Sequence, residues 1–110
     1  MEGLKRGDVV VVALQGDYGK PRPALVVQSD LFSTHSTVAI LPITSEILAA
    51  PLFRISVEPS ADNGLKKPCQ IMVDKPYTVA EEKIGGRIGR LDEKMLLQVN
   101  RSMMVWLGLP

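Results

Sequence analysis

The residues of this chain that are best suited to chemistry lie in the stretch Pro21-Arg22-Pro23, directly before an apolar run. Each proline fixes its own φ and favours extended backbone at the preceding residue. Arg22 is therefore expected on a stiff segment at the mouth of a strand. Its planar, charged guanidinium can bind two phosphate oxygens and stabilise charge that develops on them. The same pattern also fits an ordinary surface arginine paired with a carboxylate, and the local sequence leaves both interpretations open.

Other candidate groups carry less information when each is taken alone. Thr44 follows an apolar run and offers a hydroxyl that could hold a phosphate oxygen or satisfy the backbone. Tyr18 could stack on an unpaired base or pack at the rim of its own loop. His35 is the only histidine, which excludes a mechanism that needs two histidines. Cys69 lies in an apolar run, which is typical of a buried, unreactive thiol.

The composition bounds the class of protein. With 110 residues, of which 45% are hydrophobic and 23% charged, we expect one globular domain over residues 1–110. A formal net charge of +1 means that binding to nucleic acid would need a local basic patch. The single cysteine allows no internal disulfide and fits a reducing cytoplasmic setting. The first residues are charged and no long apolar run occurs, so we expect neither a signal peptide nor a membrane anchor.

Apolar runs separated by turn residues predict a series of short strands. The predicted strands are 9–14, 24–28, 37–43, 52–57 and 69–73. Pro42 suggests an edge or a bulge near the end of the third strand. Residues 45–51 could form one helical turn or a loop. A capping-box pattern at Thr78–Glu81 predicts a short helix that ends at Gly85-Gly86, and residues 87–91 fit a last strand or a linker.

Asp92 is predicted to cap one long helix, which extends to about Leu107. An apolar stripe recurs along it at helical spacing and predicts a face packed on the core. The stripe consists of Leu96, Val99, Met103 and Trp106. Closely spaced strands followed by one helix predict an α+β fold, in which the helix packs on a small antiparallel barrel or curled sheet.

Blocks of sequence spread over nearly the whole chain resemble, in order, the MazF/PemK (Kid-like) toxins of bacterial type II toxin–antitoxin modules. The blocks are Arg6-Gly7-Asp8-Val9-Val10, Pro21-Arg22-Pro23-Ala24-Leu25-Val26-Val27, Leu41-Pro42-Ile43-Thr44-Ser45, Gly64 to Asp74 and Arg87-Ile88-Gly89-Arg90-Leu91. The resemblance implies an SH3-like barrel of the CcdB/PemK type with a C-terminal helix, acting as a homodimer. It also implies a metal-independent endoribonuclease, an mRNA interferase without cofactor, that cuts single-stranded RNA at short sequences.

The resemblance further assigns roles to individual residues. It implies that Arg22 and Thr44 are catalytic. The predicted RNA-binding residues are Gln15, Tyr18, Lys20, Ser45, Gln70, Asp74 and Lys75. The general base stays open between Asp17, Glu46 and Asp74. The implied partner is a cognate antitoxin, small and acidic, with an extended segment that becomes ordered when it covers the RNA groove.

Two other hypotheses belong to different functional classes. CcdB toxins share this barrel and poison DNA gyrase without enzymatic chemistry, through a C-terminal Trp-Gly-Ile. The segment Trp106-Leu107-Gly108 is similar to that motif. The position of Trp106 on the predicted core stripe, and the pair Arg22 and Thr44, favour the ribonuclease instead. The remaining hypothesis is a barrel that binds protein or nucleic acid without catalysis.

Overall fold

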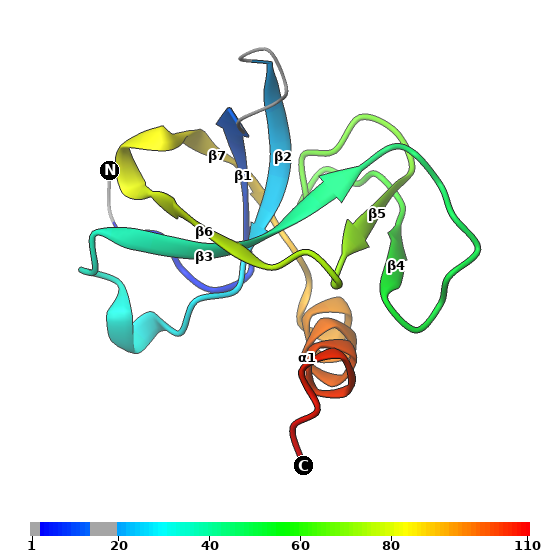
Figure 1. The fold of residues 1–110 in the computed structure, drawn as a ribbon. Coiled ribbons are helices and arrows are strands. Elements are labelled where there is room, and N and C mark those ends of the chain that lie inside the picture. The colour runs from blue at the N-terminus through cyan, green and yellow to red at the C-terminus, as the bar shows by residue number, and fades with distance from the viewer. Residues whose placement is uncertain (1–2, 14–19) are drawn as a thin grey trace.

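The computed structural model describes residues 3–13 and 20–110. In these residues seven antiparallel strands form one curled sheet, and one α-helix follows it (Figure 1). The strands are β1 (Asp8–Ala13), β2 (Pro21–Val26), β3 (Thr37–Thr44), β4 (Arg54–Val57), β5 (Cys69–Met72), β6 (Tyr77–Ala80) and β7 (Ile84–Arg90). Two short 3₁₀ turns, η1 (Asp30–Phe32) and η2 (Glu81–Lys83), lie between strands, and the helix is α1 (Glu93–Leu107). The predicted α+β class is confirmed.

The strand order explains why the apolar runs do not alternate with polar residues. The order is β4-β5-β3-β2-β1-β7, and β6 pairs with β3 as well. Val9 and Leu25 face a core cluster that includes Leu96 and Val99 of α1. Val10 and Ala24 point to the other side of the sheet and pack into a second cluster inside the curl. Both faces of β1 and β2 are therefore buried, which demands apolar residues at consecutive positions.

Helix α1 begins and ends where the sequence predicts. The Asp92 carboxylate accepts a hydrogen bond from Met95 N at 2.7 Å, and Gly108 ends the helix in the left-handed region at φ +70°. The apolar stripe reaches the core through the buried Leu96 and Val99 and the partly buried Met103, but not through Trp106. Trp106, predicted to be a core residue, is 49% exposed and meets Phe53 at 5.9 Å between ring centroids. That part of the prediction is wrong, because the last turn, residues 104–107, is exposed.

The predicted short helix at Thr78–Glu81 is also wrong. Residues Tyr77–Ala80 form β6, which pairs with Thr37–Ile40 of β3, and only η2 after it is helical in character. Gly85 and Gly86 belong to β7 rather than to a helix end. Tertiary contacts decide the outcome. The β-branched residues Thr78 and Val79 form backbone pairs with β3, and Val79 also packs against the second core cluster. Of the two alternatives for residues 87–91, a strand or a linker, the strand is correct, since β7 extends to Arg90.

Strand β3 occupies the interior of the sheet, so Pro42 marks neither an edge strand nor a bulge. On one side β3 pairs with β2. On its other side it pairs first with β6, over Thr37–Ile40, and then with β5, at Ile43 and Thr44. Pro42 lies between these two segments, so its missing N–H coincides with the change of partner. Residues 45–51, for which the sequence left one helical turn or a loop open, contain no helix.

Candidate functional site

The ends of β2 and β3 open into a cleft with a volume of about 790 Å³. The ladder between these strands covers only Ala24 to Val26, because Pro23 and Pro21 have no N–H with which to continue it. Extending that register by two residues places Arg22 opposite Thr44. Both residues line the cleft, Arg22 as an exposed side chain and Thr44 as a half-buried one. The two residues expected to be catalytic are therefore brought to one site.

Arg22 lies inside β2 rather than before it. The strand begins at Pro21, and Arg22 pairs with Val12 of β1, so pairing extends through both prolines on that side. The predicted start at residue 24 is three residues late. The flanking prolines and the pairing with β1 together fix the Arg22 backbone, which leaves the guanidinium on a rigid support.

The Thr44 hydroxyl is oriented by the segment that follows β3. Its Oγ1 accepts a hydrogen bond from the backbone N–H of Glu46 at 3.0 Å. This bond uses the hydroxyl as an acceptor, so its own O–H can donate to a phosphate oxygen or interact with a ribose hydroxyl. Ser45 and Glu46 also line the cleft and are exposed.

The loop before β5 forms another part of the cleft lining. Lys66 and Lys67 line the cleft and are exposed. The loop is held by the buried Asn63, whose Oδ1 accepts from Ser60 N at 3.0 Å and Leu65 N at 2.9 Å. Its Nδ2 donates to the Glu58 carbonyl at 2.9 Å. Because these bonds lie within the loop, they fix the base from which the two lysines project.

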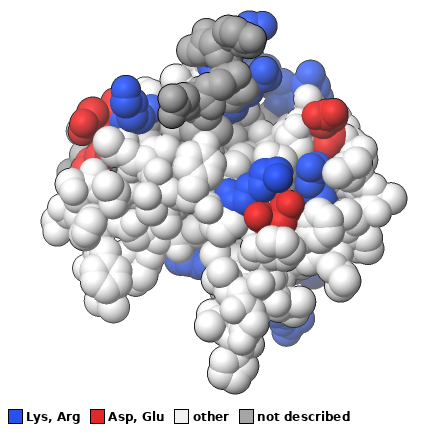
Figure 2. Space-filling model, in the orientation of Figure 1, with Lys and Arg blue, Asp and Glu red and all other residues white. Residues whose placement is uncertain are grey.

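The cleft concentrates positive charge on a chain that is nearly neutral. Arg22, Lys66 and Lys67 line it together with one described carboxylate, that of Glu46. On the face drawn in Figure 2, charged side chains occur in small groups separated by uncharged surface. The local basic patch that nucleic-acid binding requires in such a protein is therefore supplied at this cleft.

The predicted RNA-binding residues do not all meet there. Ser45 lines the cleft, whereas Lys20, Asp74 and Lys75 are not among its lining residues. The Asp74 carboxylate is partly buried: its Oδ2 lies 3.7 Å from Lys75 Nζ, and its Oδ1 has no hydrogen-bond partner among the described residues. Gln15 and Tyr18 lie outside the described residues, as does Asp17, one of the candidate bases.

Gln70 is placed in a way that the sequence did not suggest. Its side chain is only 4% exposed, and it lies under the segment that follows Thr44. Its amide donates to the Leu48 carbonyl at 2.9 Å and accepts from Leu48 N at 3.0 Å. These bonds use both ends of the amide, so the geometry does not support the predicted direct contact with RNA.

Among the candidates for a general base, Glu46 is the one that the described structure places on the cleft. Asp74 lies away from it. Cys69 also lines the cleft but is buried, and its thiol donates to the Lys67 carbonyl at 3.2 Å. Burial raises the pKa of the Cys69 thiol, which opposes formation of a thiolate nucleophile. Across residues 3–13 and 20–110, no group of three or more His, Cys, Asp or Glu side chains could hold a metal ion.

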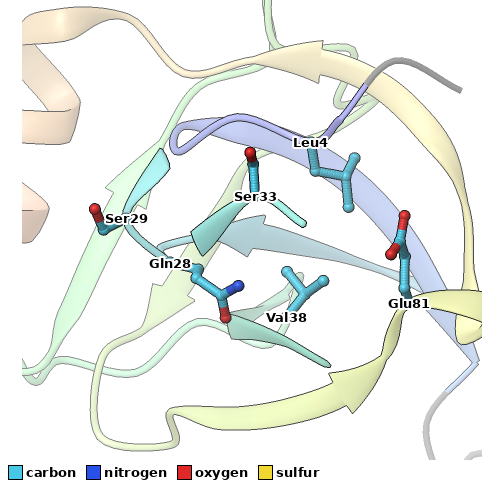
Figure 3. A pocket seen from close by; sticks show the side chains of 6 residues that line it. All are labelled: Leu4, Gln28, Ser29, Ser33, Val38 and Glu81. Carbon is cyan, nitrogen blue, oxygen red and sulfur yellow. The ribbon is translucent and has the colours of Figure 1, made fainter. Parts of the chain in front are cut away.

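A second hollow lies near the start of β3, beside Leu4, Gln28 and Glu81 (Figure 3). Its volume of about 10 Å³ is at the lower limit for holding a single water molecule. None of its lining residues belongs to the larger cleft. This hollow therefore offers no room for a substrate.

Comparison with known proteins places the chain in a family. Residues 5–107 match the family model of PemK-like, MazF-like toxins of type II toxin–antitoxin systems. The chain belongs to this family. It is 38% identical over 107 residues to a probable endoribonuclease MazF of Mycolicibacterium smegmatis, covering 96% of this chain and 98% of that protein. It is 30% identical over 112 residues to endoribonuclease EndoA of Bacillus subtilis, covering 96% of each.

Solved structures of MazF-like toxins share the fold. An endoribonuclease in complex with its cognate antitoxin, from a mycobacterial species, superposes with a TM-score of 0.80 at 22% identity, covering 100% of this chain and 98% of that one. A MazE–MazF structure from Deinococcus radiodurans gives a TM-score of 0.80 at 17% identity and covers 100% of both chains. The match to MazF-like toxins does not favour the CcdB-like alternative. Within the described residues, no helix has the length and hydropathy needed to cross a membrane.

Proposed function

We propose that this MazF-family chain is a toxin that cleaves single-stranded RNA at the cleft between β2 and β3. The observation that carries the proposal is that Arg22 and Thr44 line the same cleft. Membership of the MazF family and the names of the relatives, which are endoribonucleases, support it. We treat residues 1–110 as one toxin domain that acts in the cytoplasm and is neutralised by a cognate antitoxin.

The chemistry follows from the groups on the cleft. The 2′-hydroxyl of RNA attacks the adjacent phosphorus, forming a 2′,3′-cyclic phosphate and breaking the bond to the 5′-oxygen. The RNA supplies the nucleophile, so the reaction needs no metal ion to activate a water molecule. Arg22 stabilises negative charge on the phosphoryl oxygens, and the Thr44 hydroxyl donates to one of them or positions the 2′-hydroxyl. Lys66 and Lys67 hold flanking phosphates elsewhere on the cleft lining.

The proton of the 2′-hydroxyl needs an acceptor, and the 5′-oxygen needs a proton as it leaves. Water supplies the proton to the 5′-oxygen, and we assign the first role to Glu46, since its carboxylate lies on the same cleft as Arg22 and Thr44. Replacing it by glutamine keeps the shape and removes the base. The variant Glu46→Gln should therefore lower kcat, while its affinity for an RNA that cannot be cleaved stays close to the parent value.

A homodimer is the proposed assembly. Helix α1 leaves several apolar side chains at least two-fifths exposed, most of them in its last turn, which a partner would cover. These residues are Leu97, Met104, Val105, Trp106 and Leu107. Sedimentation of the purified chain tests this assembly independently of RNA cleavage.

The decisive experiment uses a defined single-stranded RNA in EDTA. We expect the parent protein to cut it and to leave cyclic phosphate ends, while Arg22→Ala and Thr44→Ala lose almost all cleavage. Arg101→Ala, on the exposed side of α1, is the matched control and should retain activity. The proposal is overturned if a folded parent protein cuts no RNA, or if both site variants cut as well as the control.

A further inference from the structure

We infer that Gln70 is a positioning residue that acts on catalysis through the segment 46–48 and the Thr44 hydroxyl. The inference rests on the proposed ribonuclease function and adds a residue that does not touch RNA. Gln70 lies on β5 directly opposite Thr44 of β3 in the strand register. Its side chain is only 4% exposed and does not line the cleft. It lies instead beneath the loop of residues 45–49.

The Gln70 amide clamps one residue of the loop from both sides. Its Nε2 donates to the Leu48 carbonyl at 2.9 Å, and its Oε1 accepts from the Leu48 N–H at 3.0 Å. A side-chain amide that pairs with both backbone groups of one residue replaces the partners that a neighbouring strand would supply. Leu48 is thereby fixed in position and in orientation.

A second set of bonds connects this clamp to Thr44. Arg54 Nη1 donates to Gln70 Oε1 at 3.2 Å and to the Glu46 carbonyl at 3.1 Å. The Glu46 N–H in turn donates to Thr44 Oγ1 at 3.0 Å. A continuous path of hydrogen bonds therefore runs from Gln70 through Arg54 and Glu46 to the Thr44 hydroxyl.

The loop has little else to hold it. Residues 45–49 are all exposed, including the apolar Ile47 at 56% and Leu48 at 51%. Side-chain burial therefore does not fix this segment, and its ordering depends on the bonds to Gln70 and Arg54. Loss of the clamp should let the Glu46 N–H move away from Thr44 and free the hydroxyl to rotate.

The expected kinetic signature separates positioning from binding. Gln70→Leu removes the clamp with little change in volume and should lower kcat by about tenfold, a typical result of misplacing a reacting group. Its affinity for a 2′-O-methyl RNA that cannot be cleaved should stay within about twofold of the parent value, because Arg22 and the two lysines remain. Gln70→Glu keeps both acceptor bonds, from Leu48 N and Arg54, and loses the donor bonds to the Leu48 carbonyl and Ser56 Oγ, so its loss of kcat should be smaller.

Gln28 offers a matched control. It lies between β2 and η1 and binds Ala39 in the first half of β3. Its amide also clamps a loop, donating to the Phe32 carbonyl at 3.0 Å and accepting from Ala39 N at 2.9 Å. Gln28→Leu should therefore cost similar stability without lowering the kcat of the folded protein. A fall in kcat confined to Gln70→Leu, at matched folded fraction, supports the inference.

Combination with Thr44→Ala tests the route of the effect. If Gln70 acts through the Thr44 hydroxyl, then adding Gln70→Leu to Thr44→Ala should lower the residual activity no further. Full additivity of the two variants, or an equal loss in Gln28→Leu, overturns the inference. If Gln70→Leu does not fold, Gln70→Glu is measured instead, alone and combined with Thr44→Ala, and the results are judged in the same way. A parent protein that cuts no RNA refutes the proposed function instead.

Discussion

Gly89 of β7 packs directly against the backbone of Asn63, so that a Cβ atom on Gly89 would collide with the Asn63 carbonyl. The contact joins the last strand to the loop that carries Lys66 and Lys67. It is reinforced by a hydrogen bond from Arg90 N to the Asp62 carbonyl at 2.7 Å. The basic wall of the cleft is therefore braced by the strand that leads into α1.

Gly89→Ala should destabilise the fold by about 1–3 kcal/mol, the range for forcing an extra carbon into packed structure. Backbone atoms cannot move aside as a flexible side chain can, so the strand and the loop must separate. Urea denaturation measures the change in midpoint at constant slope. Gly3→Ala is the control, because its new methyl would lie 3.7 Å from Ser33 Cβ, an ordinary contact. Equal midpoints for the two variants would contradict this prediction.

Asp8 is predicted to be a structural anchor. Its carboxylate is fully buried and accepts hydrogen bonds from Lys5 N at 2.8 Å, Arg87 Nη1 at 3.2 Å and Arg90 Nη1 at 3.1 Å. Asp8→Asn removes the negative charge and turns an NH₂ group toward at least one of these donors, which should cost about 2 kcal/mol of unfolding free energy. Glu93→Gln should change it by less than about 0.5 kcal/mol, since that exposed carboxylate lies 3.9 Å from Arg90. Thermal or urea unfolding of both variants checks the difference.

Arg22→Lys should behave almost like Arg22→Ala. A lysine keeps the charge but presents one ammonium in place of the planar fork that binds two phosphoryl oxygens. We expect kcat/KM to fall by about a hundredfold, in the range for removal of one preorganised donor of a transition state. Single-turnover cleavage measures it, with Arg101→Lys on α1 as the control. Cleavage by Arg22→Lys at the parent rate would show that charge alone suffices.

Lys66→Gln and Lys67→Gln should weaken binding without changing the chemical step. Each lost contact between a lysine and a phosphate should reduce the slope of log K against log salt by about 0.7 for single-stranded RNA. Titration of a 2′-O-methyl RNA at several salt concentrations gives that slope. Lys94→Gln, a lysine on α1 away from the cleft, should leave it unchanged. An unchanged slope in the double variant Lys66→Gln/Lys67→Gln would remove these residues from the RNA site.

The Cys69 thiol should react slowly while the protein is folded. Burial raises its pKa, so the folded state holds the thiol proton more tightly than the unfolded state does. Its stabilising effect is therefore complete below the ordinary thiol pKa and is lost as pH rises above about 9. The rate of reaction with a disulfide reagent at pH 8 should be much lower in buffer than in urea. Cys69→Ser should show a flatter decline of stability in that alkaline range.

Local sequence determined much of the fold. Consecutive valines predict β1, and Asp92 and Gly108 predict the ends of α1, because capping and strand propensity act over a few residues. Local sequence was misleading at Thr78–Glu81, where a capping pattern yields to pairing with β3. It was also misleading at Trp106, because periodicity shows which residues share a face but not where the sheet beneath that face ends.

For the site, the residue types alone marked Arg22 and Thr44 as candidates and left ordinary structural roles open, and the resemblance to the MazF/PemK toxins selected them as the expected catalytic pair. Only the tertiary structure decided that they line the same cleft, because this depends on how distant strands pair. The tertiary structure likewise turned Gln70 from an expected RNA contact into a buried clamp. Whether an amide points into a cleft or under a loop is fixed by the partners that folding brings to it, and residue type carries no information about those partners.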